Sequence, residues 1–71
     1  MRDNIEVRPY LQVGVRRFYE GDKVKVVDVI GNSWVGKLTS ITDDGILISD
    51  GWGVVVLYSN IKRINHVRLG D

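Results

Sequence analysis

Turn signals recur about every ten residues from Glu20 to the end of the chain and divide it into five short runs rich in valine and isoleucine. Within these runs apolar residues alternate with polar ones, as they do in strands that bury one face. The chain has 71 residues, which is too short for a two-sheet sandwich. The pattern therefore predicts an all-β fold, a small five-stranded and strongly bent barrel over residues 20–71.

The first of these runs carries an irregularity. Lys23 and Lys25 alternate with valines, and then Val27 and Val29 continue on the other parity. A change of phase inside a strand indicates a bulge or a sharp bend, here near residues 26–28. In the next run Gly36 lies in mid-strand, which indicates a bend or a close approach of another backbone segment.

Two structures are open for residues 1–19. Apolar side chains occupy alternate positions up to residue 15, which indicates a long strand that Pro9 confines to the edge of a sheet. Alternatively, Pro9 is the first residue of a short helix that ends at Gly21, with a buried stripe formed by Leu11, Val15 and Phe18. We predict an N-terminal strand or arm, with the short helix as the alternative.

Composition excludes several classes of protein. There is no cysteine and only one histidine, so neither a disulfide framework nor a metal site is expected, and no cofactor is predicted. The net charge of +1 differs from that of strongly basic duplex-DNA proteins. No apolar run approaches the ~18 residues of a membrane span, so we expect a cytoplasmic protein. Small domains without disulfides often self-associate, so a homo-oligomer is expected.

The stretch VKVVDVIGNSWVGKLTSITDDGILIS resembles the first motif of the Sm-like proteins, the family of Hfq and the Sm and Lsm ring proteins. The shared spacing is Gly31, four residues, Gly36, then Leu38, Ile41 and an acidic turn. VLYSNIKRI resembles the second motif, in which a short turn leads into the fifth strand. The resemblance covers residues 22–66. It implies an Sm-like or Src-homology-like small barrel and a module that binds RNA.

Two groups of residues are candidates for binding nucleic acid. Tyr58 is suited to stacking a base and Asn60 to bonding its edge, next to cationic side chains that can contact phosphate. A second group combines arginines with neighbouring aromatic residues, as single-strand-binding surfaces do. The cationic candidates are Lys62 and Arg63 in the first group and Arg16 and Arg17 in the second. Lys37, which lies between the two groups in the sequence, is a further candidate. The alternative is that these charged side chains face solvent on the exposed sides of strands and bind no ligand.

A protein-binding module is the alternative function. Trp52 lies in a turn between two glycines, where it either folds over the barrel or anchors a partner. Trp34 and Tyr19 are further candidates, although each also suits packing on the core. The missing Asp-x-x-Asn pattern at residues 43–46 favours this alternative, as does the near-neutral charge. No convergent acid, base and nucleophile are present, so an enzyme is not expected.

Overall fold

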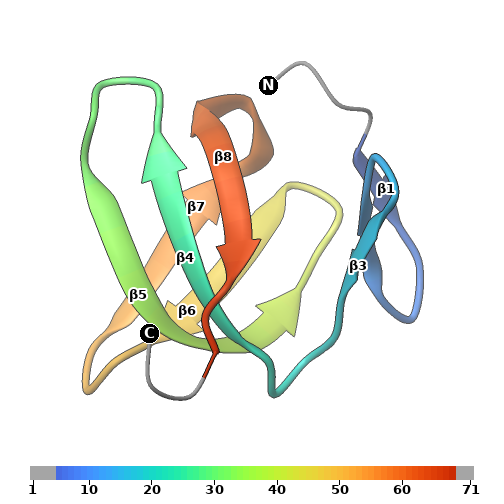
Figure 1. Cartoon of the computed structure of the whole chain (residues 1–71), viewed down its shortest axis with the longest axis horizontal. Coiled ribbons are helices and arrows are strands. Elements are labelled where there is room, and N and C mark those ends of the chain that lie inside the picture. Colours follow the sequence, from blue (N-terminus) through green and yellow to red (C-terminus); the bar gives the residue numbers. More distant parts are fainter. Residues whose placement is uncertain (1–4, 69–71) are drawn as a thin grey trace.

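The computed structural model describes residues 5–68 and shows an all-β chain with two antiparallel sheets (Figure 1). Residues 1–4 of the predicted N-terminal segment and residues 69–71 of the predicted barrel region lie outside the described part. No helix within the described part is long and apolar enough to cross a membrane. In chain order the elements are β1 (Ile5–Val7), β2 (Leu11–Val13), β3 (Arg16–Phe18), β4 (Lys23–Asp28), β5 (Ser33–Ile41), β6 (Gly45–Ser49), β7 (Gly53–Leu57), the 3-10 turn η1 (Tyr58–Asn60) and β8 (Ile61–His66).

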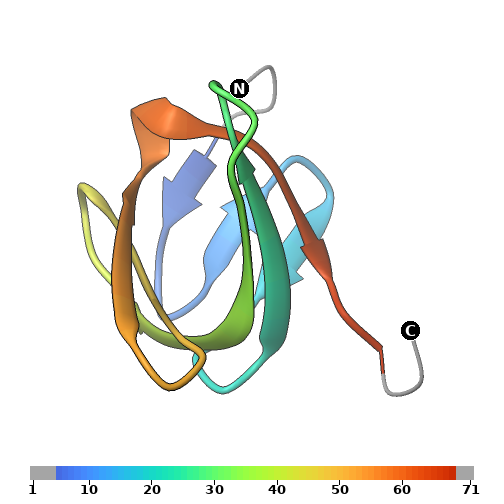
Figure 2. The same ribbon diagram turned by 90° about the vertical axis from the view of Figure 1, so that its left-hand side faces the viewer.

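The larger sheet has five strands in the order β7-β6-β5-β4-β8, which confirms the five runs predicted from the turn signals. Strands β4 to β7 follow one another as hairpins, and β8 returns to pair with β4. Figure 2 shows the sheet curling so strongly that β6 and β7 face β4 and β8. Among the described residues β7 and β8 are the two edges of the sheet, and no pairing joins them.

The N-terminal segment forms neither the long strand nor the helix that was predicted. β1, β2 and β3 instead pair as a three-stranded sheet. Pro9 lies in the turn between β1 and β2, and Gly14 begins the next turn with a φ of 59°, which glycine adopts without a steric penalty. Val15 follows in that turn and is 97% exposed, whereas the predicted helix would bury it. The two turns therefore divide the segment into three short strands.

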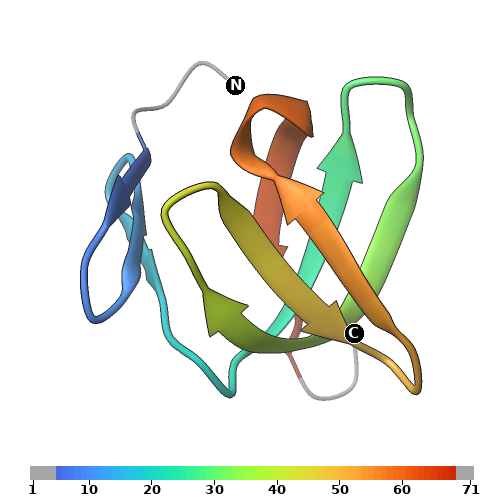
Figure 3. The ribbon, with the colours of Figure 1, turned by 180° about the vertical axis from the view of Figure 1, so that it is seen from behind.

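One hydrophobic core joins the two sheets. The N-terminal sheet lies to one side of the curled sheet (Figure 3) and contributes Leu11, Val13 and Phe18. The larger sheet contributes the inward residues of its strands, as alternation predicts. These residues are Val24, Val26, Leu38, Ile46, Ile48, Val56, Ile61 and Ile64. Because a chain of this length buries a modest share of its surface, the three residues from the smaller sheet form an important part of the core.

The contact between β3 and the end of β8 holds the two sheets together. Phe18 is fully buried and stacks on the imidazole of His66, with ring centroids 4.2 Å apart and planes inclined by 20°. The Arg16 guanidinium donates a hydrogen bond of 2.6 Å to Asn65 Oδ1. His66 Nε2 lies 3.3 Å from Asp22 Oδ2. An apolar contact and two polar contacts thus connect segments from opposite ends of the chain.

The irregularity predicted near residues 26–28 is present, but its cause differs. The register between β4 and β8 shifts between Val27 and Asp28. The inward parity nevertheless continues to Asp28, which is 6% exposed, while Val29 is 56% exposed. The Asp28 carboxylate accepts hydrogen bonds from the backbone N–H groups of Ile30 and Asn32. The alternating pattern predicted an inward Val29. The prediction was wrong because the Asp28 side chain closes a turn at this point, and the strand ends before Val29.

Gly36 is a point of close approach between β5 and β6, as its mid-strand position predicted. A Cβ atom at this position would lie 2.6 Å from the carbonyl oxygen of Ser49 and 2.8 Å from Cγ2 of Ile48. Both distances are shorter than van der Waals contact, and one of them involves backbone. The sheet can therefore bend tightly here only with glycine in this position.

We expect Gly36→Ala to lower the free energy of unfolding by about 1–3 kcal/mol, the usual cost of overpacking. Gly53→Ala is the matched control, because its added Cβ would meet only Leu47 Cδ1, at an ordinary 3.5 Å. That variant should remain within about 0.5 kcal/mol of the parent. Urea unfolding followed by circular dichroism measures both, and equal midpoints would contradict the close contact at Gly36.

Candidate nucleic-acid interface

The register of β4 with its two neighbours brings cationic side chains together on the outer face of the larger sheet. Lys23 and Lys25 point outward because Val24 and Val26 occupy the inward positions of the same strand. Lys37 of β5 pairs directly with Lys23. On the other side of β4, Arg63 of β8 pairs with Val27. Asn65 of β8 pairs with Lys25, and its side chain accepts a hydrogen bond from Arg16. We call Lys23, Lys25, Lys37, Arg63 and Arg16 the basic face.

No carboxylate of residues 5–68 forms an ion pair with a cation of the basic face. Within residues 5–68, the ion pairs are Arg8 with Glu6 and His66 with Asp22, and neither involves a cation of this face. Lys23 and Lys37 are directly opposite one another in the register of β4 and β5. A surface with several unpaired cations attracts anions such as a polyanionic strand.

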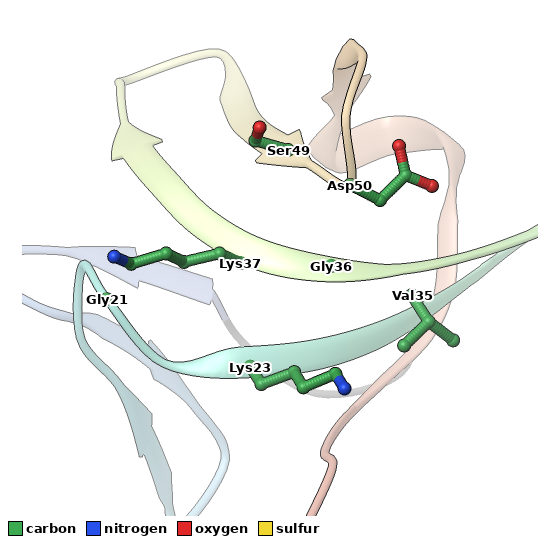
Figure 4. A pocket seen from close by; sticks show the side chains of 7 residues that line it. All are labelled: Gly21, Lys23, Val35, Gly36, Lys37, Ser49 and Asp50. Atoms are coloured by element: carbon green, nitrogen blue, oxygen red, sulfur yellow. The ribbon is translucent and has the colours of Figure 1, made fainter.

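A hollow of about 470 Å³ opens on the basic face where the sheet bends (Figure 4). Figure 4 shows the side chains of Lys23 and Lys37 extending in opposite directions along it. Asp50 contributes a carboxylate to the lining and Ser49 a hydroxyl. The lining as a whole consists of Gly21, Lys23, Val35, Gly36, Lys37, Ser49 and Asp50. The hollow thus combines two cations with one carboxylate and one hydroxyl.

Trp52 is held away from the core. It lies in the turn between β6 and β7 and is 82% exposed. Of the two orientations open from the sequence, the indole therefore points into solvent and does not fold over the core. Asp50 and Gly51 form the turn: the backbone N–H of Trp52 donates to Asp50 Oδ1, and Gly51 has a φ of 102°. Trp34, in contrast, is half-buried and packs against the core. Only one of the two tryptophans is therefore presented to solvent.

Arg16, Arg17 and Tyr19 are near one another in sequence, but the structure separates their roles. Arg16 is half-buried and joins the basic face through Asn65. Arg17 lies over the Tyr10 ring, 4.7 Å from its centroid, and donates a hydrogen bond to a side chain of β2. Tyr19 is 47% exposed, and its ring centroid lies 5.4 Å from that of Tyr10. Arg17 and Tyr19 thus belong to an aromatic cluster of the N-terminal sheet.

Tyr58 and Asn60 lie in η1, before β8, and the structure gives Tyr58 an internal role. Its ring packs against the core, and its hydroxyl donates a hydrogen bond of 2.6 Å to the carbonyl oxygen of Thr42. Burial, together with the charges of Asp43 and Asp44, raises the pKa of Tyr58 to about 12. The Asn60 side chain is exposed. Tyr58 is thus engaged in holding η1 against the turn between β5 and β6.

A bulge in β8 explains why two successive cations, Lys62 and Arg63, are both exposed. Val27 pairs with Arg63 and Asp28 pairs with Ile61, so Lys62 is the extra residue of the bulge. The strict alternation of a regular strand would turn one of the two side chains inward.

The Tyr58 hydroxyl predicts a specific loss of stability at high pH. An unfolded tyrosine has a pKa near 10, whereas the folded value is about 12. The unfolded state therefore binds fewer protons between these values. The stabilisation from this group is complete below about pH 10 and disappears as pH rises through about 12. Tyr58→Phe should cost about 0.5–1.5 kcal/mol at neutral pH and should show a shallower decline above pH 10.

Urea unfolding of the parent and of Tyr58→Phe at a series of pH values between about 8 and 12 tests this prediction. Tyr19→Phe is the control, because it removes the hydroxyl of a tyrosine that is 47% exposed. A parallel decline of the parent and Tyr58→Phe would contradict the assigned role.

Lys23 and Lys25 are the members of the basic face that the sequence did not identify as binding residues. Their outward direction follows from alternation, but the pairing with Lys37 and β8 is a property of the register. No group of three or more histidine or acidic side chains in residues 5–68 is arranged to hold a metal ion. Comparison of the chain with protein-family models, curated proteins and solved structures finds no match. The evidence for function is therefore the geometry of this surface.

Proposed function

We propose that the protein is a non-catalytic module that binds RNA or single-stranded DNA across the basic face. The observation that carries the proposal is the direct pairing of Lys23 with Lys37 beside Lys25, with no carboxylate of the described residues paired to any of the three. Phosphates of a strand would take the place of the missing partners. The proposal keeps Lys37, Arg63 and Arg16 as phosphate contacts and adds Lys23 and Lys25, but it does not use Tyr58 to stack a base, because the Tyr58 hydroxyl is already engaged with Thr42.

A single strand suits this surface better than a duplex. Lys23, Lys25 and Lys37 lie on the outer face of the larger sheet, which is small and strongly curved (Figure 2), and the net charge of the whole chain is only +1. A duplex needs a broad and strongly basic surface to contact phosphates of two strands. A single strand can follow the curvature and can present its bases to exposed aromatic side chains.

The experiment is fluorescence anisotropy with short labelled RNA and single-stranded DNA at several salt concentrations. Five phosphate contacts on a single strand predict a slope of log affinity against log salt of about −3.5. Affinity should then fall roughly 100-fold between about 50 and 200 mM salt. Absence of binding at about 50 mM salt would reject the proposal.

We also propose that the sheet is a small barrel of the Sm-like or Src-homology-like kind that self-associates. The strand order, the strong curl and the motifs over residues 22–66 support this arrangement. Self-association is supported by the two edge strands, β7 and β8, whose outward backbone groups have no partner strand in the described residues. Light scattering should give a multiple of 8.0 kDa, and a monomer of 8.0 kDa would contradict an assembled ring.

A protein-binding module remains the second candidate because apolar side chains are exposed beside Trp52. Val55 and Leu57 of β7 are 69% and 45% exposed. Large exposed aromatic and aliphatic side chains are typical anchors of protein interfaces. The salt titration separates the two candidates, because a protein interface centred on β7 gives no affinity for oligonucleotides.

A further inference from the structure

The exposure of Trp52 is not required by the turn that contains it. Asp50 supplies the side-chain oxygen of the turn and Gly51 supplies the left-handed residue. A small polar residue would complete such a turn equally well. The indole is 82% exposed, so nearly its whole flat surface is available for contact with a ligand.

The same turn borders the hollow on the basic face. Asp50 lines the hollow together with Lys23 and Lys37, and Trp52 follows two positions later. Ser49, which pairs with Gly53, closes the hairpin and also lines the hollow. Trp52 is therefore two residues along the chain from Asp50, which Figure 4 shows in the lining of the hollow together with Lys23 and Lys37.

This combination fits one chemistry, a nucleotide within a single strand. The indole offers a flat π surface that stacks on any base, whereas the lysines offer charge for the phosphate. An apolar peptide would use the indole but would leave the lysines without partners. A free phosphate ion would use the lysines but not the indole.

We infer that Trp52 stacks a base of a bound single strand whose phosphates lie on Lys23 and Lys37. The inference rests on the proposed function and adds to it the base contact and the side chain that makes it. Asp50 serves to fix the turn, since its Oδ1 accepts a hydrogen bond from the backbone N–H of Trp52. The stacking tolerates any base sequence, because every base has a π face.

Tryptophan fluorescence tests the inference with an oligothymidylate of about ten nucleotides and an abasic strand of equal length. The thymidylate strand should quench Trp52, and the abasic strand should bind through its phosphates without quenching. In Trp52→Phe only Trp34 still emits, so the quenching should disappear while affinity stays close to that of the parent. Trp52→Ala should weaken binding of the thymidylate strand about 5- to 150-fold and leave the salt slope unchanged.

The controls separate this inference from the proposed function. Circular dichroism and the emission of Trp34 test whether Trp52→Ala is folded. If both strands bind with steep salt dependence but Trp52 is neither quenched nor needed, the stacking is rejected and the proposed function stands. If Trp52→Ala weakens both strands equally, the contact is not to a base and the inference is again rejected. If neither strand binds at about 50 mM salt, both proposals fail.

Discussion

Replacement of Phe18 by alanine is expected to lower the free energy of unfolding by about 3–5 kcal/mol, the largest effect on stability of any variant considered. Phe18 is fully buried, stacks on His66 of β8 and lies opposite Leu11 of β2. Its removal leaves a cavity where the N-terminal sheet meets the larger sheet. A domain of this length has a total stability of roughly 4–10 kcal/mol, so a large part of it would be lost.

Urea unfolding followed by circular dichroism measures this effect. Tyr19→Ala is the matched control, because Tyr19 is the next aromatic residue in the chain and is 47% exposed. Phe18→Leu should retain much of the stability, since it keeps most of the buried volume. If Phe18→Ala and Tyr19→Ala unfold at the same urea concentration, the N-terminal sheet does not depend on this contact.

The second large effect is expected on affinity. The double variant Lys23→Ala, Lys37→Ala should reduce binding of single-stranded nucleic acid roughly 60-fold at about 50 mM salt, because each phosphate contact on a single strand contributes a factor of about 8 there. The slope of log affinity against log salt should become shallower by about 1.4. The fold should not suffer, since both side chains are exposed.

Anisotropy titrations at several salt concentrations measure both quantities. Arg8→Ala serves as the control for each single lysine variant, because it removes one positive charge that is paired with Glu6 on the N-terminal sheet. That variant should change affinity less than twofold and should leave the slope unchanged. Equal losses for Arg8→Ala and Lys37→Ala would show that net charge, rather than the basic face, governs binding.

Local patterns predicted the larger sheet well. The turn at Asp50 and Gly51 and the inward direction of Val24 and Val26 in β4 follow from patterns among near neighbours in the sequence, and a glycine in mid-strand was enough to predict a close contact at Gly36. The outward direction of Lys23 follows from the same alternation. Short-range patterns determine where strands lie and which side chains face inward, and these features were predicted correctly.

Features that depend on partners distant in sequence were not predicted. Nothing local shows that Lys23 lies opposite Lys37, that Arg16 reaches Asn65, or that the Tyr58 hydroxyl meets Thr42. The N-terminal turns were missed for a different reason. The alternation of apolar residues continues across Gly14, so only the left-handed conformation of this glycine reveals that the chain reverses there.

The return of β8 to β4 has a consequence for the kinetics of folding. Strands β4 to β7 are successive hairpins, and each needs only a short loop to close, a process of about 1–10 μs. Pairing of β8 with β4 instead joins Val24 to His66 and closes a loop that contains all the other strands of the sheet. The entropy of loop closure grows with loop length, and non-local pairing slows folding across small proteins. The rate-limiting step of folding is therefore expected to be the docking of β8, and the hairpins form before it.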